Sequence, residues 1–134
     1  MSYDLMVFDA AAAPRSRAAF IAWYDQNAHS TEPSSDDLSM LTAELKAWFM
    51  EMIEDFPPMN GPLACLDVDD PSVTDYGLSP SSIYAMFSWS QAEAAYHRTI
   101  ELAAKHRVGF FDVSAPHGDI WTPTSDGKLE KLAN

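Results

Sequence analysis

Large apolar side chains recur at helical spacing between residues 41 and 56, and the pattern stops at two consecutive prolines. The members of this stripe are Leu41, Leu45, Trp48, Phe49, Met52, Ile53 and Phe56. Residues with this spacing share one face of an α-helix, and such a face must be buried against another element. Pro57 and Pro58 end the helix because proline lacks an amide donor and disfavours helical backbone at the residue before it. We therefore expect a structural helix, with Trp48 buried in the core.

The remaining elements follow from apolar periodicity and from turn and cap residues. We predict strands at 2–9, 81–89, 108–114 and 120–123, and two further helices at 14–28 and from 90 to about 106. The strand at 81–89, the helix after it and the strand at 108–114 should form a right-handed parallel crossover, followed by an antiparallel hairpin. The order β, α, α, β, α, β, β predicts an α+β fold: a two-layer sandwich with helices packed on a mixed sheet of about four strands.

The chain is long enough, at 134 residues, for one domain with one substantial core. We place this domain at 1–123 and expect residues 124–134 to form a flexible C-terminal tail. Residues 59–80 are rich in Asp, Pro and Gly, and we expect a long surface loop of the kind that binds partners. Cys65 is the only cysteine, and the first residues lack the positive charge of a signal peptide. Both features predict a cytoplasmic protein without disulfides.

The net charge of −12 is distributed unevenly along the chain. Between Ala18 and His97, Lys46 is the only Lys or Arg, against thirteen Asp and Glu. Proteins that bind nucleic acid neutralise its phosphates with Lys and Arg, so this composition excludes DNA or RNA as the direct ligand. A basic protein partner is compatible with it, because clustered carboxylates accelerate the encounter with a basic surface. The alternative is that the acidic surface only keeps the protein in solution.

Two segments partly match a phosphatase motif and a calcium-binding motif, but each lacks residues that the motif requires. Asp9 at a strand end resembles the nucleophile of haloacid-dehalogenase phosphatases, but Ala11 stands where that family needs a second Asp. An EF-hand calcium loop starting at Asp67 would place Pro71 and Ser72 at the positions of an oxygen ligand and the turn glycine. We therefore expect no metal site and no cofactor.

Asp112 and His117 are the remaining candidates for chemistry. Asp112 lies inside an apolar strand, where a carboxylate must be paired or have a perturbed pKa. We expect an ion pair with Arg98 or Arg107; the alternative is a catalytic acid. His117 lies in a predicted turn beside Asp119, and a His and Asp pair can serve as a base and its orienting partner. No activated nucleophile is spaced to join His117. A small cytosolic enzyme using Asp112 or His117 is therefore only the alternative function.

Segments distributed over most of the chain resemble a group of small acidic bacterial proteins encoded beside polymorphic or type VI secretion toxins. The segments are SYDLMVFD, AFIAWYD, AWFMEMIEDFPPMNGPLA, SSIYAMFSWSQAEAAY and AAKHRVGFFDVSAPHGDIW. The resemblance extends to Trp121 and implies an immunity protein, which protects the producing cell by binding a cognate toxin, often a nuclease. It implies a binding protein and not an enzyme. Its motifs are packing motifs, so no toxin-contacting residue is carried over.

The expected docking face lies between Glu51 and Asp75, where seven carboxylates occur without a Lys or Arg. Its expected contact residues are Glu51, Glu54, Asp55, Asp67, Asp69, Asp70, Asp75 and Tyr76. These acids would cover the basic substrate-binding surface of a nuclease toxin. An interface also needs a desolvated aromatic or Arg anchor, and the aromatic candidates are Trp48, Trp89, Trp121, Tyr76 and Tyr84. Tyr76, in the predicted loop, is the expected exposed anchor.

A further alternative is a dimeric structural or ligand-sensing domain. Such a domain would bury its aromatic side chains across a two-fold interface between copies of this chain. An enzyme would instead show a pocket with convergent polar groups, and a binding protein an acidic face that is flat or protruding.

Overall fold

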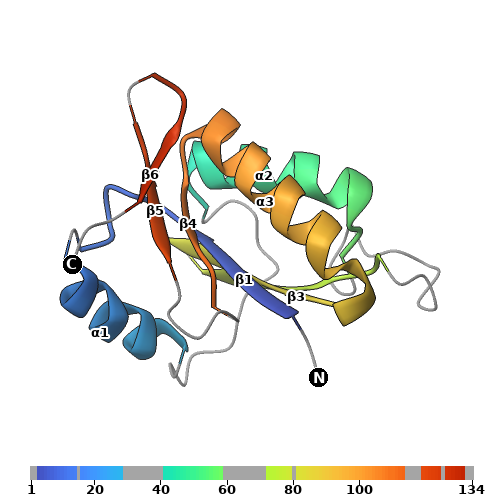
Figure 1. Ribbon diagram of the computed structural model, residues 1–134, viewed down its shortest axis with the longest axis horizontal. Coiled ribbons are helices and arrows are strands. Elements are labelled where there is room, and N and C mark those ends of the chain that lie inside the picture. Colours follow the sequence, from blue (N-terminus) through green and yellow to red (C-terminus); the bar gives the residue numbers. More distant parts are fainter. Residues whose placement is uncertain are drawn as a thin grey trace.

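In the part of the chain that the structure describes, six strands form one antiparallel sheet with helices on both faces (Figure 1). The computed structural model describes residues 3–14, 16–28, 41–58, 72–79, 81–113, 119–124 and 126–131. The strands are β1 (Tyr3–Phe8), β2 (Asp75–Ser79), β3 (Ser82–Phe87), β4 (Gly109–Phe111), β5 (Ile120–Pro123) and β6 (Leu129–Lys131). The helices are α1 (Arg17–Ala28), α2 (Ala43–Asp55) and α3 (Ala92–His106), and a short 3₁₀ turn, η2 (Trp89–Gln91), leads into α3. The predicted α+β class is confirmed.

The position of β1 in the middle of the sheet determines the topology. The strand order is β2-β3-β1-β4-β5-β6, and each neighbouring pair of strands is antiparallel. Because β3 and β4 are both antiparallel to β1, they run in the same direction, as predicted for the crossover through α3. However, β1 lies between them. The prediction of a mixed sheet is therefore wrong, because the first strand of the chain separates the two strands that would have made the parallel pair.

Both faces of β1 are buried, and this places helices on both sides of the sheet. Leu5 and Val7 belong to a core formed with α2 and α3, whereas Met6 and Phe8 belong to a second core formed with α1. Successive side chains of a strand alternate between the faces, so a run of four buried residues requires cover on both sides. The predicted two-layer arrangement differs from the structure in this respect: α2 and α3 lie on one face and α1 lies on the other (Figure 1).

The helix α2 is the structural helix that the apolar stripe predicts. Thr42 precedes its first turn, and the Thr42 hydroxyl accepts a hydrogen bond from the Leu45 amide at 3.2 Å. Trp48 has no exposed surface, which confirms its prediction as a core residue. Its indole Nε1 donates to the carbonyl oxygen of Thr99 in α3 at 3.3 Å. The buried indole therefore joins the two helices that cover this face of the sheet.

Two strands lie in segments for which the sequence predicts none. β2 occupies the end of the predicted loop at 59–80, and β6 lies within the predicted tail at 124–134. β2 pairs with β3 from Asp75 opposite Met86 to Ser79 opposite Ser82, and β6 pairs with β5. Their sequences, DYGLS and LEK, have weak strand propensity, but the edges of β3 and β5 offer them hydrogen-bond partners. The sheet thus continues beyond residue 123, where we expected the domain to end.

Phe8 and Gly109 form a close pair across β1 and β4. The two residues lie directly opposite each other in the antiparallel register. A Cβ atom added to Gly109 would lie 2.2 Å from two atoms of the Phe8 ring, which is too close for carbon atoms that are not bonded. Glycine within a strand often marks such a close approach. Phe8 is fully buried, so its ring occupies the space that a side chain at position 109 would need.

We predict that Gly109→Ala lowers the free energy of unfolding by roughly 1 to 3 kcal/mol, because the new methyl group must displace a ring within a packed core. Gly77→Ala in β2 is the matched control, since its Cβ would meet Tyr84 only at the ordinary contact distances of 3.8 and 3.9 Å. Urea unfolding followed by circular dichroism measures both variants. Equal stability of the two variants would show that the Phe8 ring moves aside without cost.

Thr99 is a buried residue of α3, and its side chain carries a hydroxyl group. Thr99 is 1% exposed, and its Oγ1 atom has no hydrogen-bond partner among the described residues. We predict that Thr99→Val, which keeps the side-chain shape, leaves the free energy of unfolding unchanged or raises it by up to about 1 kcal/mol. Thr99→Ser keeps the hydroxyl but removes a buried methyl group, and should lower it by about 1 kcal/mol. Thermal unfolding compares them. A clear loss of stability in the valine variant would mean that the hydroxyl has a partner.

Candidate partner interface

An ion-pair network joins α2 and α3 in the region where the sequence predicts part of the docking face. The Glu51 carboxylate lies 2.6 Å from Lys105 Nζ, 2.9 Å from His106 Nε2 and 3.8 Å from Arg98 Nη2. The Nε atom of Arg98 also lies 2.8 Å from the Asp55 carboxylate. Cations of the protein itself therefore compensate the charges of Glu51 and Asp55. Both acids therefore link α2 to α3, and their contact with a partner stays a prediction.

This network also gives Arg98 partners other than the one that we expected. Arg98 was one predicted partner of Asp112, but its ion pairs in the described structure are with Glu51, Asp55 and Glu101. His106, in the last turn of α3, contacts the Glu51 carboxylate on the neighbouring helix.

The pKa of the Glu51 carboxyl lies below its ordinary value. The hydrogen bond with Lys105 is the largest cause, partial desolvation acts in the opposite direction, and His106 lowers the pKa further. A carboxyl whose pKa is lower in the folded protein stabilises the fold at pH values above its ordinary pKa. This stabilisation is lost as the pH falls through the pKa of the folded state. Glu51 should therefore contribute to stability at neutral pH and lose that contribution in acid.

We predict that Glu51→Gln lowers the melting temperature at pH 7, and that the difference from the wild type shrinks as the pH falls below 4.5, the ordinary value for glutamate. Glu54→Gln is the matched control, because Glu54 is exposed on the same helix and makes no ion pair with a described residue. Differential scanning calorimetry between pH 3 and pH 8 makes the comparison. A difference that stays constant over this range would assign the effect to packing and not to charge.

Tyr76, the predicted exposed anchor, is buried in the core, so this prediction is wrong. Its hydroxyl donates to the carbonyl oxygen of Phe56 at 2.7 Å, and its ring packs edge-on against Phe49 with the centroids 5.0 Å apart. Burial is the main cause that raises the pKa of the phenol above its ordinary value. Tyr76 belongs to a strand and not to a loop, and its position in β2 directs the ring towards α2.

The other predicted contact residues do not form one cluster in the described part of the chain. Glu54 is exposed on α2. Asp75 precedes Tyr76 in β2, so the alternation of the strand places it on the sheet face opposite α2. Asp67, Asp69 and Asp70 lie outside the described residues, and their role stays a prediction.

Asp112 lies directly after β4, and its charge acts on two tyrosines. Its amide donates to the carbonyl oxygen of Asp119 at 3.1 Å. The phenols of Tyr3 and Tyr96 both have raised pKa values, first because of burial and second because of the charge of Asp112. His117, the other candidate for chemistry, lies outside the described residues. The charge of Asp112 thus acts on two partly buried phenols. The expected pairing of His117 with Asp119 stays a prediction.

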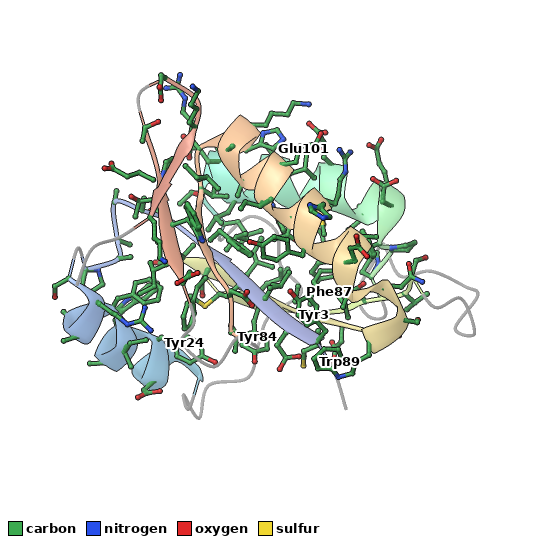
Figure 2. The ribbon with its side chains drawn as sticks, in the orientation of Figure 1. Tyr3, Tyr24, Tyr84, Phe87, Trp89 and Glu101 are labelled. Carbon is green, nitrogen blue, oxygen red and sulfur yellow. The ribbon has the colours of Figure 1, made fainter. Side chains whose placement is uncertain are left out.

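A second group of polar aromatic side chains connects α1 to the sheet. The Tyr84 hydroxyl donates to a carboxylate oxygen of Asp4 at 2.8 Å. Burial, followed by this hydrogen bond, raises the pKa of Tyr84 above its ordinary value. Tyr24 of α1 lies beside Tyr84, and its ring packs edge-on against Phe111 at 5.0 Å (Figure 2). Tyr84 was a candidate anchor for a partner, but these contacts give it a role within the fold.

Trp89 is the large aromatic side chain with the greatest exposure in the described structure. Its relative exposure is 50%, and its ring centroid lies 5.2 Å from that of Tyr3, with the planes inclined at 56°. Figure 2 shows Tyr3, Phe87 and Trp89 together at the end of the sheet where α3 begins. Sequence reasoning included Trp89 among five aromatic candidates. It did not single this residue out, because Trp89 falls at the end of the strand predicted at 81–89.

Two acidic residues are related to this exposed indole, one through its position in the chain and one through its effect on Tyr3. Glu93 is exposed in the first turn of α3, four residues after Trp89. Asp112 acts on Tyr3, whose pKa is raised to about 12 by burial, then by Asp112 and then by Tyr96. We call Tyr3, Trp89, Glu93 and Asp112 the Trp89 surface. It combines an accessible aromatic ring with two carboxylates, and both features are typical of protein-binding surfaces for basic partners.

Comparisons with known proteins do not assign a family. Neither a protein-family model, nor a curated protein, nor a solved structure matches this chain. None of the described helices has the length and apolar character that a membrane span requires. Among the described residues, no three His, Cys, Asp or Glu side chains are grouped so that they could hold a metal ion. A functional proposal therefore depends on the side chains of the candidate interface themselves.

Proposed function

We propose that this chain is an immunity protein, which neutralises a basic toxin, and a nuclease in particular, by binding it at the Trp89 surface. The observation that carries the proposal is the indole of Trp89, which remains 50% exposed while it rests on Tyr3. Tryptophan is enriched among the residues that contribute most of the energy of protein interfaces. Removing its apolar surface from water on binding is favourable. An exposed indole supported by a second ring is therefore well suited to anchor a partner.

The distribution of charge supports a basic partner. The chain has a net charge of −12, and part of its small complement of Lys and Arg forms ion pairs within the described structure. These residues are Arg98, Lys105 and Lys131, which contact Asp55, Glu51 and Asp119. The large surplus of negative charge would accelerate association with a basic surface. Asp67, Asp69, Asp70 and Asp75 remain proposed contributors to this field.

The mode of inhibition follows from the partner's own chemistry. A nuclease must present Lys and Arg where it holds the phosphates of its substrate. An acidic protein that covers this surface excludes the nucleic acid and needs no catalytic group of its own. The proposal therefore describes a binding protein and not an enzyme. It also places the protein in the cytoplasm, where a nuclease toxin would meet the nucleic acid of the cell.

We predict that Trp89→Ala weakens binding to the toxin encoded by the adjacent reading frame by roughly 10- to 100-fold in Kd, because it removes the anchor of the interface. Met50→Ala is the matched control: Met50 is 42% exposed on α2 and lies outside the Trp89 surface. Surface plasmon resonance with a catalytically inactive toxin measures affinity, and host survival on co-expression with the active toxin measures protection. The association rate of the wild type should fall as salt increases.

Two outcomes would contradict parts of this proposal. If both variants bind and protect like the wild type, the Trp89 surface is not the interface. If the wild type neither binds the toxin nor protects the host, the chain is not an immunity protein for it. Circular dichroism of both variants shows whether each is folded, so that a loss of binding is not confused with a loss of structure.

A further inference from the structure

We infer that α1 is a movable cover, which opens and closes over its face of the sheet while the strands, α2 and α3 stay folded. This conformational change is independent of the proposed function, and it concerns the face of the sheet opposite α2 and α3. It is carried by three features of the structure: the few buried side chains of α1, the aromatic rings through which α1 reaches the sheet, and a larger core that does not include α1.

Few side chains of α1 are buried. Of the α1 side chains that the structure describes, Phe20 alone is fully buried, whereas Ala18, Ala19, Ala22 and Asp25 are exposed. By contrast, α2 and α3 each bury four side chains. Local opening requires the least free energy where few buried apolar contacts hold an element in place. Among the three helices, α1 is therefore the one that is released first.

Aromatic rings make the contacts of α1 with the sheet. The Phe20 ring packs on Phe8 of β1 and on Phe111 of β4, with the centroids 4.8 and 5.2 Å apart. Trp23 packs on Phe8 at 6.1 Å, and Tyr24 packs on Phe111 at 5.0 Å. The cluster around these rings contains no described residue of α2 or α3, and α1 lies by itself on its side of the sheet (Figure 1). Release of α1 therefore separates these rings and leaves the pair of α2 and α3 intact.

The larger core does not depend on α1. This helix contributes no strand, so the pairings of β1 with β3 and β4 remain when it leaves. Leu5 and Val7 hold β1 in the core on the other face, which includes no described residue of α1. In that core the Trp48 indole joins α2 to α3 through its hydrogen bond to Thr99. The sheet with α2 and α3 can thus stay folded while α1 is open.

The backbone turn before α1 marks where the movement begins. The Asp9 amide donates to the carbonyl oxygen of Ser81 at 2.8 Å, and the Ala13 amide donates to the carbonyl oxygen of Asp9 at 3.1 Å. These bonds keep the turn on the sheet, so the chain opens after Ala13. A released α1 unwinds, because a helix of 12 residues is only marginally stable in water by itself. Opening thus exposes the amides of α1 together with the rings of Phe8 and Phe111.

Native-state hydrogen exchange of the full chain, followed by NMR, tests this inference. After correction for intrinsic rates, we expect the amides of residues 21–28 to exchange roughly 10-fold or more faster than those of residues 48–52 and 99–103. Their exchange should also respond weakly to urea below the global transition, because opening exposes little surface. Equal rates with an equally steep response to urea would show that α1 unfolds only with the whole protein, and would overturn the inference.

Phe49→Leu and Phe20→Leu are a matched pair of variants, because each removes a buried ring, one from α2 and one from α1. Phe49→Leu destabilises the closed and the open state alike. It should therefore accelerate exchange in α2 and α3 by roughly 5- to 30-fold and leave exchange in α1 unchanged. Phe20→Leu destabilises the closed state alone, and should accelerate exchange in α1 by a similar factor.

Either variant can contradict the inference. If Phe49→Leu accelerates exchange in α1 as much as in α2, then α1 opens only when the whole protein unfolds. If Phe20→Leu leaves exchange in α1 unchanged, the ring of Phe20 does not hold the helix on the sheet. Circular dichroism shows that each variant is folded before exchange begins. None of these measurements uses the toxin, so their outcome is separate from that of the proposed function.

Discussion

Burial of β1 on both faces, together with strand pairing along both of its edges, is the constraint on which the rest of the structure depends. Six residues of β1 pair with β3 and three pair with β4. Leu5 and Val7 require α2 and α3 as cover, whereas Met6 and Phe8 require α1. Because β1 separates β3 from β4, the connection through α3 must pass over the first strand. This arrangement brings the start of α3 and the N-terminal end of β1 together, where Trp89 meets Tyr3.

The carboxylates of α2 take part in contacts within the fold. Glu51 and Asp55 form ion pairs with Arg98 and Lys105, and Glu51 also contacts His106; these contacts join two helices that the buried Trp48 also links. Isolated ion pairs near the surface contribute little to stability, but several around one carboxylate act together. Acids engaged in this way are less available to a partner. The binding role that we propose therefore belongs to the other end of α3.

The parts of the fold that could be predicted from the sequence are those with a strong local period. The stripe from Leu41 to Phe56 and the two prolines after it predict α2 and the burial of Trp48, because helical spacing alone decides which side chains share a face. The two short strands β2 and β6 could not be predicted in this way. Tyr76 shows the consequence for the candidate site: it belongs to β2, whose pairing with β3 directs its ring into the core. The composition of residues 59–80 predicts a loop, and for that reason Tyr76 was expected to be an exposed anchor.

The sequence by itself determined the α+β class, the burial of α2 and the strongly negative charge, because composition and local periodicity are properties of neighbouring residues. Only the tertiary structure decided that helices cover both faces of the sheet, that Glu51 is engaged by Arg98, Lys105 and His106, and that Trp89 remains accessible. The partners in these contacts are far apart in the sequence. Tyr3 and Trp89, for example, are separated by α1, α2, β2 and β3. Exposure of a side chain depends on what the folded chain places against it, and no local pattern contains that information.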